Sequence, residues 1–426
     1  MMKRSDSTMK ITHKVSIIVL GVILFITAIT GYRNFASSVN LIDGAKRREL
    51  QSVATLIEEY LQGQVDKASA RASLVAGIPA IQAAFRAHDR KELIRRLLPV
   101  FLLQREKFGV REAAFSLAPA TSFLRLFDLK NFGEDLSAFR EMILATNVTQ
   151  ESQQGVEIGR RGLSIRGMTV VKDDQGVIGS FEVWIDFSTL VNAVKKISGF
   201  EVGVFVDDEL MSSIATAFPR PDKDRIIGGL QNVESTDWAK IHPIITADLF
   251  TKMNDITYKI QTVGGVDYGL TIVPLLDFKG LEIGAIVAVR NFEIFRAQME
   301  ACFVNAVTSA LGQAVILAAI VFVVFNALVI RPMTHINDTL SRLADEDINV
   351  EIGKLPQTED ELGSLAQHIA KLKKISANSS SSSSRDMLAL TATPALSPHR
   401  QKQPDRSTGR RSATHSRAHG TGLPPR

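Results

Sequence analysis

The sequence contains little cysteine and no compact group of histidines. Cys302 is the single cysteine among 426 residues, which excludes an intrachain disulfide and any multi-cysteine zinc or iron–sulfur site. Of the eight histidines, only His415 and His419 have a ligand-like spacing, and they lie in a polar tail without a core around them. The chain also lacks a phosphate-binding loop, a Gly-x-Ser-x-Gly motif and a His-Glu-x-x-His motif. From these absences we predict no metal, no cofactor and no enzyme activity within this chain.

Positive charge is in excess only in the C-terminal segment. The whole chain carries a formal net charge of +5. Residues 376–426 hold two acidic residues, Asp386 and Asp405, and eight basic ones: Arg385, Arg400, Lys402, Arg406, Arg410, Arg411, Arg417 and Arg426. This segment has a net charge of +6, which leaves −1 for residues 1–375. It is rich in Ser, Pro and Arg and has no aromatic residue, so we predict a disordered, basic, low-complexity tail and expect no nucleic acid as a partner.

Two long runs, 15–31 and 311–330, carry no charge. A helix of about 20 residues, at about 1.5 Å per residue, crosses the hydrocarbon core of a bilayer. We predict transmembrane helices over 11–32 and 309–330; a cleaved signal peptide is the alternative for the first run and a buried core helix for the second. The basic N-terminus, residues 1–10, predicts a cytoplasmic end. Residues 33–305 would then form a periplasmic or extracellular domain of a multi-pass protein of the cytoplasmic (inner) membrane, in contact with membrane lipid.

The exported segment reads first as helix and then as strand. Apolar side chains at helical spacing from Val53 to Ala68 predict a long helix over 36–76, which ends at Gly77 and Pro79. This apolar face is expected to pack on the rest of the domain or on a second subunit. Further helix is expected to about residue 108 and over 132–148. Strands are expected over 111–117, 121–127, 163–172 and 177–185, the last two as a hairpin.

An internal repeat follows. Residues 177–187, VIGSFEVWIDF, align without a gap with residues 282–292, EIGAIVAVRNF, each as Ile-Gly, a strand, a polar residue, Phe and then a helix. In the second copy a meander of strands is expected over 256–263, 266–276 and 282–292. A repeat of this length is too long for a solenoid and predicts two tandem α+β modules with antiparallel sheets. Chance similarity of two hairpins is the alternative.

Residues 331–375 resemble a HAMP linker. Pro332 ends the second apolar run, and two seams at heptad spacing follow: Ile336, Leu340 and Leu343, then Leu362, Leu365, Ile369 and Leu372. Ile348 and Ile352 stand in the connector, and Asp-Glu-Leu-Gly opens the second helix. Asp347 replaces the usual connector glycine. The resemblance implies pairing of these helices in a homodimer; a generic helical hairpin is the alternative.

With this linker placed, the chain from 1 to about 376 resembles a bacterial methyl-accepting chemotaxis protein with a double-Cache sensor. The segments that carry the resemblance are ATSFLRLF (120–127), GVEIGRRGLSIRG (155–167), LQNVESTDW (230–238) and GVDYGLTIVPLLDFKG (265–280). It implies an α+β fold in which two PAS-like (Cache) modules with antiparallel sheets stand on the long helix, a membrane-distal one over 77–198 and a membrane-proximal one over 199–300. It also implies a receptor that senses a small molecule and relays the signal through HAMP. The cytoplasmic coiled coil is missing, so the sensor portion of a histidine kinase or diguanylate cyclase, or a decoy partner of intact receptors, are alternatives.

In such receptors the ligand usually binds in the distal module. An arginine flanked by aromatic rings suits a carboxylate, because the guanidinium binds it at two points while the rings exclude water. Strand alternation predicts that Arg125 shares a face with Phe123 and Phe127, Arg166 with Ser164 and Met168, and Glu182 with Trp184. Glu182 is a candidate partner for an amine. The predicted ligand-binding residues are Phe123, Arg125, Asp135, Arg140, Arg166 and Glu182; structural ion pairs or solvated faces are the alternative.

Overall fold

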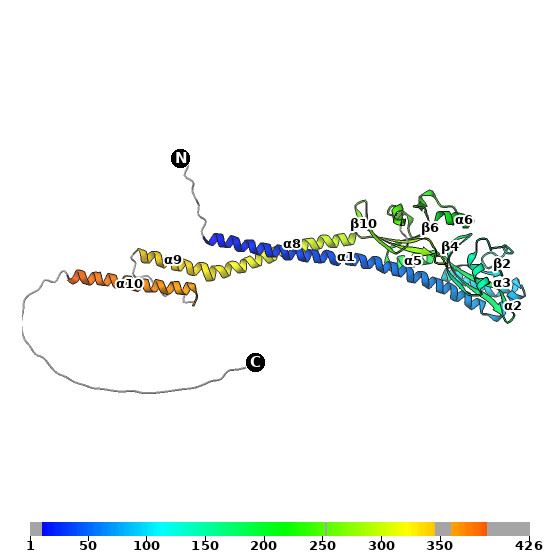
Figure 1. The fold of residues 1–426 in the computed structure, drawn as a ribbon, viewed down its shortest axis with the longest axis horizontal. Coiled ribbons are helices and arrows are strands. Elements are labelled where there is room, and N and C mark those ends of the chain that lie inside the picture. The colour runs from blue at the N-terminus through cyan, green and yellow to red at the C-terminus, as the bar shows by residue number, and fades with distance from the viewer. Residues whose placement is uncertain (1–10, 252–253, 346–358, 390–426) are drawn as a thin grey trace, which may run out of the picture. The chain divides into compact units, whose positions relative to one another are not determined.

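A computed structural model describes residues 11–251, 254–345 and 359–389 (Figure 1). The chain divides into two compact units, Ile18–Leu317 and the segments on either side of it, and each is described by itself. Helix α1 (Ile11–Ala76) is continuous for 66 residues and ends at Gly77, as predicted. Helix α2 (Pro79–Arg86) begins at Pro79, whose fixed φ suits the first helical turn. Helix α3 (Arg90–Phe108) begins where the Asp89 carboxylate accepts a hydrogen bond from the Glu92 N–H.

The first module is built on a five-stranded antiparallel sheet. Its strands are β1 (Val110–Leu117), β2 (Thr121–Arg125), β3 (Gln153–Gly159), β4 (Gly162–Asp173) and β5 (Gly176–Ile185). Their spatial order is β2-β1-β5-β4-β3, so the predicted hairpin of β4 and β5 lies at the centre. Helix α4 (Glu141–Thr149) precedes β3, and helix α5 (Phe187–Ser198) leads to the second module.

The second module is built on a six-stranded antiparallel sheet. Its strands are β6 (Glu201–Asp207), β7 (Ile226–Ile227), β8 (Leu230–Ser235), β9 (Thr257–Val263), β10 (Val266–Leu276) and β11 (Glu282–Asn291). Their spatial order is β7-β8-β6-β11-β10-β9, which confirms the predicted meander. Its short helices are α6 (Asp208–Ile214), α7 (Trp238–Ile241) and the 3-10 turns η1 (Lys223–Arg225) and η2 (Ala247–Phe250).

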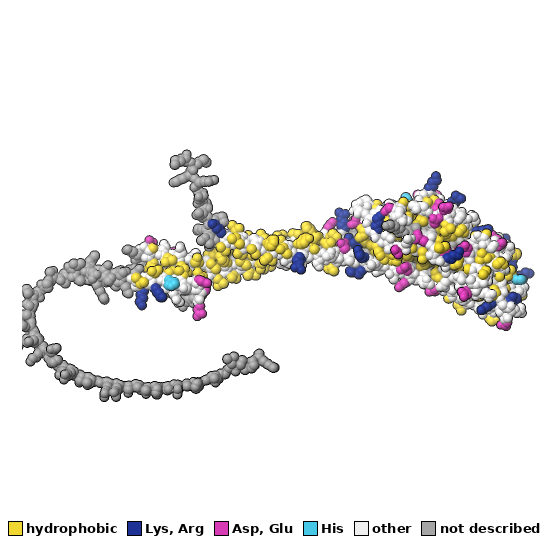
Figure 2. Space-filling view, in the orientation of Figure 1, with side chains coloured by type: hydrophobic (Ala, Val, Ile, Leu, Met, Phe, Trp, Pro, Cys, Tyr) yellow, Lys and Arg dark blue, Asp and Glu magenta, His cyan; other side chains and the backbone are white. Residues whose placement is uncertain are grey.

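Over the residues that the structure describes, two helices are long and apolar enough to cross a membrane. One is α1, and the other is formed by α8 (Glu293–Phe325) with the π-helical turn η3 (Asn326–Ile330) and the helix that follows. Within the first unit α1 and α8 touch: the Phe35 and Phe303 rings lie 5.6 Å apart. Figure 2 shows hydrophobic side chains gathered along the first part of α1 and the later part of α8, with few charged ones there.

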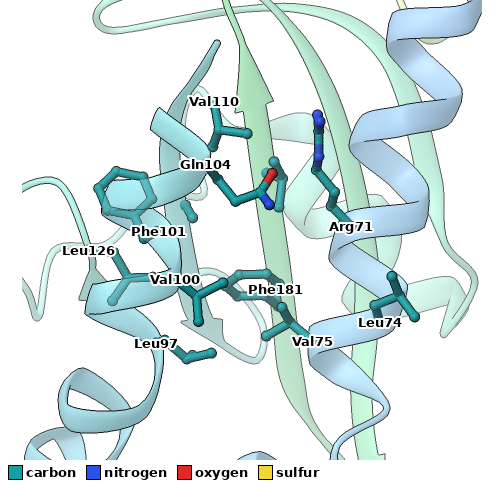
Figure 3. Close-up of a pocket in the computed structure, with 12 residues that line it drawn as sticks. Arg71, Leu74, Val75, Leu97, Val100, Phe101, Gln104, Val110, Leu126 and Phe181 are labelled. Atoms are coloured by element: carbon teal, nitrogen blue, oxygen red, sulfur yellow. The ribbon is translucent and has the colours of Figure 1, made fainter. Parts of the chain in front are cut away.

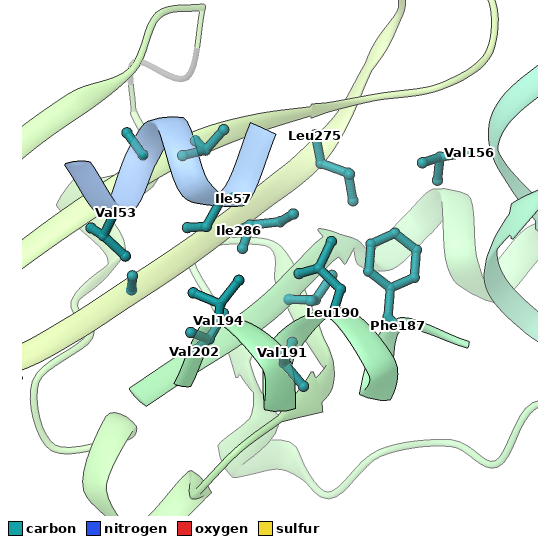
Figure 4. Packing of buried hydrophobic residues seen from close by; sticks show 14 of the residues in the cluster. Val53, Ile57, Val156, Phe187, Leu190, Val191, Val194, Val202, Leu275 and Ile286 are labelled. Carbon is teal, nitrogen blue, oxygen red and sulfur yellow. The ribbon is translucent and has the colours of Figure 1, made fainter. Parts of the chain in front are cut away.

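Helix α1 contributes to the cores of both modules. Beside the first module, it stands next to α3 over strands β1 and β5 (Figure 3), and Ala72 and Ala76 lie in a buried cluster with α2, α3 and the sheet. Beside the second module, Val53 and Ile57 pack against α5, β6 and β11 (Figure 4). The predicted apolar face of this helix is therefore covered by its own domain. Each buried Val or Ile side chain contributes about 1.5–3 kcal/mol.

The predicted repeat corresponds to β5 and β11, each an inner strand of its sheet. Its two Ile-Gly glycines, Gly179 and Gly284, serve one purpose. A Cβ at Gly179 would overlap the Ser116 carbonyl oxygen of β1, and a Cβ at Gly284 would overlap the Phe205 carbonyl oxygen of β6. Only glycine permits the neighbouring strand to come this close.

The predicted helix over 132–148 is wrong in its first half. Only Glu141–Thr149 is helical, because residues 133–136 run along β2 instead. The Ser122 N–H donates to the Glu134 carbonyl, and the Gly133 N–H donates to the Ser122 carbonyl. Gly133 adopts a φ of 82°, in the left-handed region that a helix does not use.

The second unit contains helices α9 (Arg331–Ala344) and α10 (Glu361–Ala389), which pack through Ile336, Leu362, Ala366 and Ile369. The Asp360 carboxylate accepts from the Gly363 N–H at 3.0 Å and caps α10. Leu340, Leu365 and Leu372, the rest of the predicted seam apart from Leu343, stay exposed.

The prediction of disorder from residue 376 is wrong up to residue 389. Helix α10 continues through the six serines to Ala389, since no Gly or Pro interrupts it and extension of an existing helix is favourable. The rest of the predicted tail and the connector residues Asp347, Ile348 and Ile352 lie outside the described residues.

Candidate functional site

A polar cavity of about 200 Å³ lies on one face of the first sheet. Strand pairing brings its central residues together: Trp184 on β5 stands opposite Glu112 on β1 and opposite Arg166 on β4. The lining includes five arginines and three acidic residues: Arg125, Arg140, Arg160, Arg161, Arg166, Glu112, Asp128 and Glu134. The lining alone carries two more positive than negative side chains, and two glutamates beneath it, Glu157 and Glu182, balance this excess.

A buried cluster of four charged residues forms the base of this cavity. Arg140 contacts Glu157 at 3.0 Å and binds Glu182 through two nitrogens. Arg166 contacts Glu182 at 3.0 Å, donates to the Ser164 hydroxyl at 2.6 Å and stacks on the Trp184 ring at 4.7 Å. All four charged side chains are buried, so each charge needs its partners to offset the loss of water.

The pKa values of the cluster are set by burial, which disfavours the charged form of each group, and by the neighbouring charges of opposite sign, which favour it. Burial alone would raise the pKa of Glu182, but the charges of Arg140 and Arg166 outweigh it and lower that pKa to about 2. Burial alone would lower the pKa of Arg140, and Glu182 with Glu157 raises it instead. The pKa of Arg166 is lowered by burial and by the nearby charge of Arg140. Glu182 is therefore ionised throughout the physiological range.

The rim carries looser pairs. Arg125 contacts Glu134 at 2.6 Å, and Arg160 pairs with the other oxygen of the same carboxylate. Arg161 and Arg160 also stack on the rings of Phe127 and Phe139. Arg160 and Arg161 are about half exposed, so their pairs are open to exchange with a ligand.

Two buried polar groups in the lining lack hydrogen-bond partners within the described part of the chain: the Glu112 Oε1 atom and the Trp184 indole N–H. Arg161 Nε lies 2.9 Å from Glu112 Oε1, close enough for attraction but not aligned as a hydrogen bond. Burial raises the pKa of Glu112 to about 7. An unsatisfied buried donor and acceptor are costly, and a small ligand with both kinds of group would satisfy them.

Of the predicted ligand-binding residues, Arg125, Arg140 and Arg166 line this cavity. Glu182 lies beneath it, but the proposed role for an amine does not fit, because Arg140 and Arg166 occupy its oxygens. Asp135 lies outside the lining; its carboxylate accepts from the Ser137 N–H, which lowers its pKa.

Phe123 is also misplaced by the prediction. In the pairing of β1 with β2, Phe115 faces Leu124, and the next residue, Ser116, faces Ser122. Phe123 has no partner on β1 and is the extra residue of a bulge. A bulge interrupts strand alternation. Phe123 therefore packs with Phe85 in the core on the opposite face from Arg125, and Phe127 alone joins Arg125 at the cavity.

Sequence reasoning missed six charged residues of the site: Glu112, Asp128, Glu134, Glu157, Arg160 and Arg161. Three of them stand in the segment GVEIGRRGLSIRG, so the density of charge around a strand turn was a usable signal. Within 11–251, 254–345 and 359–389, no group of three or more metal-ligating side chains is found.

Residues 46–293, more than half of the chain, match the dCache_3 family model, described as the double sensory domain of two-component sensor kinase. Among solved structures, the chain is similar to the extracellular domain of vpHK1S-Z8, described as a histidine kinase (TM-score 0.42, 14% identity, 61% of this chain and 96% of that chain). It is also similar to the ligand-binding domain of the Campylobacter jejuni chemoreceptor Tlp3 in complex with L-valine (0.37, 11%, 64% and 98%). A domain of a sensory box/GGDEF family protein from Vibrio parahaemolyticus is a third (0.40, 13%, 60% and 99%). The comparison with curated proteins found no match.

Proposed function

The chain belongs to the dCache_3 family of double sensory domains, and on this premise we propose that it is a transmembrane receptor that binds a small extracytoplasmic ligand in the polar cavity of its first module. The observation that carries the proposal is the pair of unsatisfied buried groups, Glu112 Oε1 and the Trp184 N–H, at a cavity with five arginines. Membership of a family of sensory domains and a cavity with unsatisfied polar groups both support the binding of a small ligand.

The ligand we propose is a small carboxylate that also carries a hydroxyl or an amine. Its carboxylate would accept from the Trp184 N–H and from Arg125, whose guanidinium lies at the cavity with a lowered pKa caused by burial. Its donor group would reach Glu112. Arg140 and Arg166 would position the site through Glu182 and Glu157.

The first step of signal relay in this proposal runs from β4 to α1. Gly167, the neighbour of Arg166, lies so close to α1 that a Cβ there would overlap the backbone of Ala68 and Ser69. A change at Arg166 is therefore passed to α1 without an intervening side chain. The second module is tied to the same helix, since the Thr271 hydroxyl donates to the Leu50 carbonyl at 3.1 Å.

We further propose that α1 and α8 anchor the sensor in the inner membrane and that α9 and α10 act as a HAMP relay in a homodimer. The length and apolar character of α1 and α8 support the membrane anchors. The seam residues Leu340, Leu365 and Leu372, which α9 and α10 leave exposed, support the relay. A parallel four-helix bundle of two copies would bury them. The chain itself would carry no catalytic activity.

The output is proposed to be chemoreceptor-like. A histidine kinase or diguanylate cyclase output is the second candidate, because the family description names two-component sensor kinases. A decoy that pairs with intact receptors would bind the ligand equally well but relay nothing.

The test is a thermal-shift screen of the full chain in nanodiscs with small hydroxycarboxylates, amino acids and dicarboxylates. We expect at least one compound to raise the melting temperature, and Arg125→Ala to abolish that rise. Arg95→Ala, which alters an exposed arginine of α3, is the matched control and should retain it. A shift that survives Arg125→Ala would refute the proposed site.

A second experiment tests the relay and the output. Residues 1–375 are fused to a chemoreceptor signalling domain and, separately, to a histidine kinase core. A ligand response in the first fusion alone supports the chemoreceptor, and one in the second alone supports the kinase. Binding without a response in either fusion would leave the decoy.

A further inference from the structure

The first module contains a second cavity, on the opposite face of its sheet. It encloses about 200 Å³ between α1 and α3, with strands β1 and β5 as its floor (Figure 3). Its walls are apolar: Leu74 and Val75 come from α1, Leu97 and Val100 from α3, and Phe181 from β5. None of these residues belongs to the polar cavity.

Two polar side chains, Arg71 of α1 and Gln104 of α3, reach into this cavity from its two helical walls (Figure 3). Arg71 Nη1 and Gln104 Oε1 are buried atoms without a hydrogen-bond partner among the described residues. In the part of the chain that the structure describes, Arg71 has no carboxylate partner, and its guanidinium carbon lies 5.7 Å from the centre of the Phe108 ring. Burial lowers the pKa of Arg71.

This combination is unfavourable without an occupant. Arg71 is partly buried, and its Nη1 atom has lost water without gaining a partner, while the unsatisfied amide oxygen of Gln104 adds to the cost. The same module shows the usual remedy elsewhere, since its buried arginines Arg140 and Arg166 are each paired with two glutamates. Arg71 differs from them in facing an apolar cavity rather than a carboxylate.

We propose that this cavity is a second binding site, which takes a short-chain aliphatic carboxylate with its alkyl chain between α1 and α3 and its carboxylate on Arg71 and Gln104. The guanidinium binds a carboxylate at two points, and the Gln104 amide donates its N–H after rotation about its last bond. A cavity of about 150 Å³ holds a benzene ring, so this one has room for about six carbons.

The chemistry excludes other small ligands. An alkylammonium ion would meet the like charge of Arg71, and an alkane or alcohol would leave that charge uncompensated. The cavity opens beside Leu74 and Val100, which are 73% and 50% exposed, so the alkyl chain has an entry path and would cover apolar surface now in water. Because α1 forms one wall, an occupant would bear directly on the helix that we propose to carry the signal.

The test uses the full chain in nanodiscs and calorimetric titration with hexanoate, with hexanol and hexylamine as probes of the same length. Saturable binding of hexanoate, with hexanol and hexylamine much weaker, is expected. Arg71→Gln should weaken hexanoate by at least about tenfold, since a charge-assisted pair is lost. Arg71→Glu should reverse the preference toward hexylamine. Arg95→Gln, on the exposed side of α3, should change nothing.

Val100→Trp is a second test of the site, which does not depend on the folding of the Arg71 variants. This residue is half exposed at the mouth, so a larger side chain there would block the cavity with little effect on the core, and it should abolish hexanoate binding. Glu112→Gln, in the polar cavity, should leave hexanoate binding unchanged, which separates this proposal from the proposed function. Equal binding of hexanoate and hexanol, or hexanoate binding that survives Arg71→Gln, would overturn it. So would the absence of binding together with a Leu74→Cys crosslink between two copies, because a second copy would then cover this face.

Discussion

The Arg140 guanidinium forms a two-point ion pair with the Glu182 carboxylate, with Nη1 3.2 Å from Oε1 and Nη2 2.5 Å from Oε2. The pair joins the segment before α4 to the central strand β5, 42 residues apart in sequence. Both side chains are buried, and Arg166 shares the same carboxylate. The position of α4 against the sheet therefore depends on a charge balance rather than on apolar contact alone.

Glu182→Gln should destabilise the protein strongly. It would leave Arg140 and Arg166 with one shared carboxylate, Glu157, and an uncompensated buried charge costs about 3–5 kcal/mol. Thermal melting of the full chain, followed by tryptophan fluorescence, measures the effect as a fall of several degrees. Glu92→Gln is the matched control, since Glu92 also binds two arginines, Arg95 and Arg96, but on the surface. Equal melting temperatures for the two variants would contradict this account.

The pH dependence of stability should change in Glu112→Gln. Burial raises the pKa of Glu112 from its ordinary value of 4.5 to about 7, so between these values the folded protein binds more protons than the unfolded chain. The contribution of Glu112 is therefore present at low pH and is lost as pH rises through this window. Above the folded pKa, the variant should be more stable than the wild type by up to about 3 kcal/mol.

Melting temperatures at a series of pH values from about 4 to 8 check this prediction, with the expected span set by the two pKa values. The wild type minus variant difference should fall steadily with pH. A flat difference would show that Glu112 is ionised at its ordinary pKa in the folded protein. A ligand whose donor group contacts Glu112 should also bind with an affinity that depends on pH across the same window.

The sequence was sufficient for elements with strong periodicity and insufficient for the site. The long helix, the β4–β5 hairpin and the second meander follow from apolar spacing, which is local information. The placement of Phe123 failed because a bulge depends on how β1 pairs with β2, and pairing is not local. Asp135 is a candidate through the resemblance of the segment FGEDLSAFR (132–140), but the backbone of this segment pairs with β2, and Glu134 is the carboxylate that reaches the cavity.

The buried cluster could be predicted only in part, for a different reason. Arg166 and Glu182 are candidates as charges on predicted strands, and Arg140 through the resemblance of the segment FGEDLSAFR, but the sequence does not show that these charges neutralise one another. Glu157 completes the set from β3, the strand paired with β4. A charged residue on an apolar strand can bind a ligand or form a structural ion pair. The sequence pattern is the same in both cases, and only the distances between side chains distinguish them.

Gly167→Ala should destabilise the first module and disturb its contact with α1. The new Cβ would overlap the backbone of Ala68 and Ser69, so the helix would have to move away from β4. Gly63→Ala on α1 is the contrasting control, because nothing lies near its position and alanine stabilises a helix by about 0.5–1 kcal/mol. We expect a lower melting temperature for the first variant and a slightly higher one for the second. A neutral Gly167→Ala would show that α1 is not in close contact with β4.

Phe123→Leu should separate the two faces of the first sheet. Phe123 packs against Phe85 in the core and faces away from the polar cavity, so the smaller side chain should cost about 1 kcal/mol of stability and leave ligand affinity unchanged. Arg125→Ala should weaken ligand binding and change stability little. Arg125 lines the cavity, and its ion pair with Glu134 lies near the rim. Both variants are measured by thermal melting and by titration with whichever carboxylate the screen identifies. If Phe123→Leu weakened the ligand as much as Arg125→Ala, then Phe123 would face the cavity, strand alternation would hold through β2, and the bulge would be absent in solution.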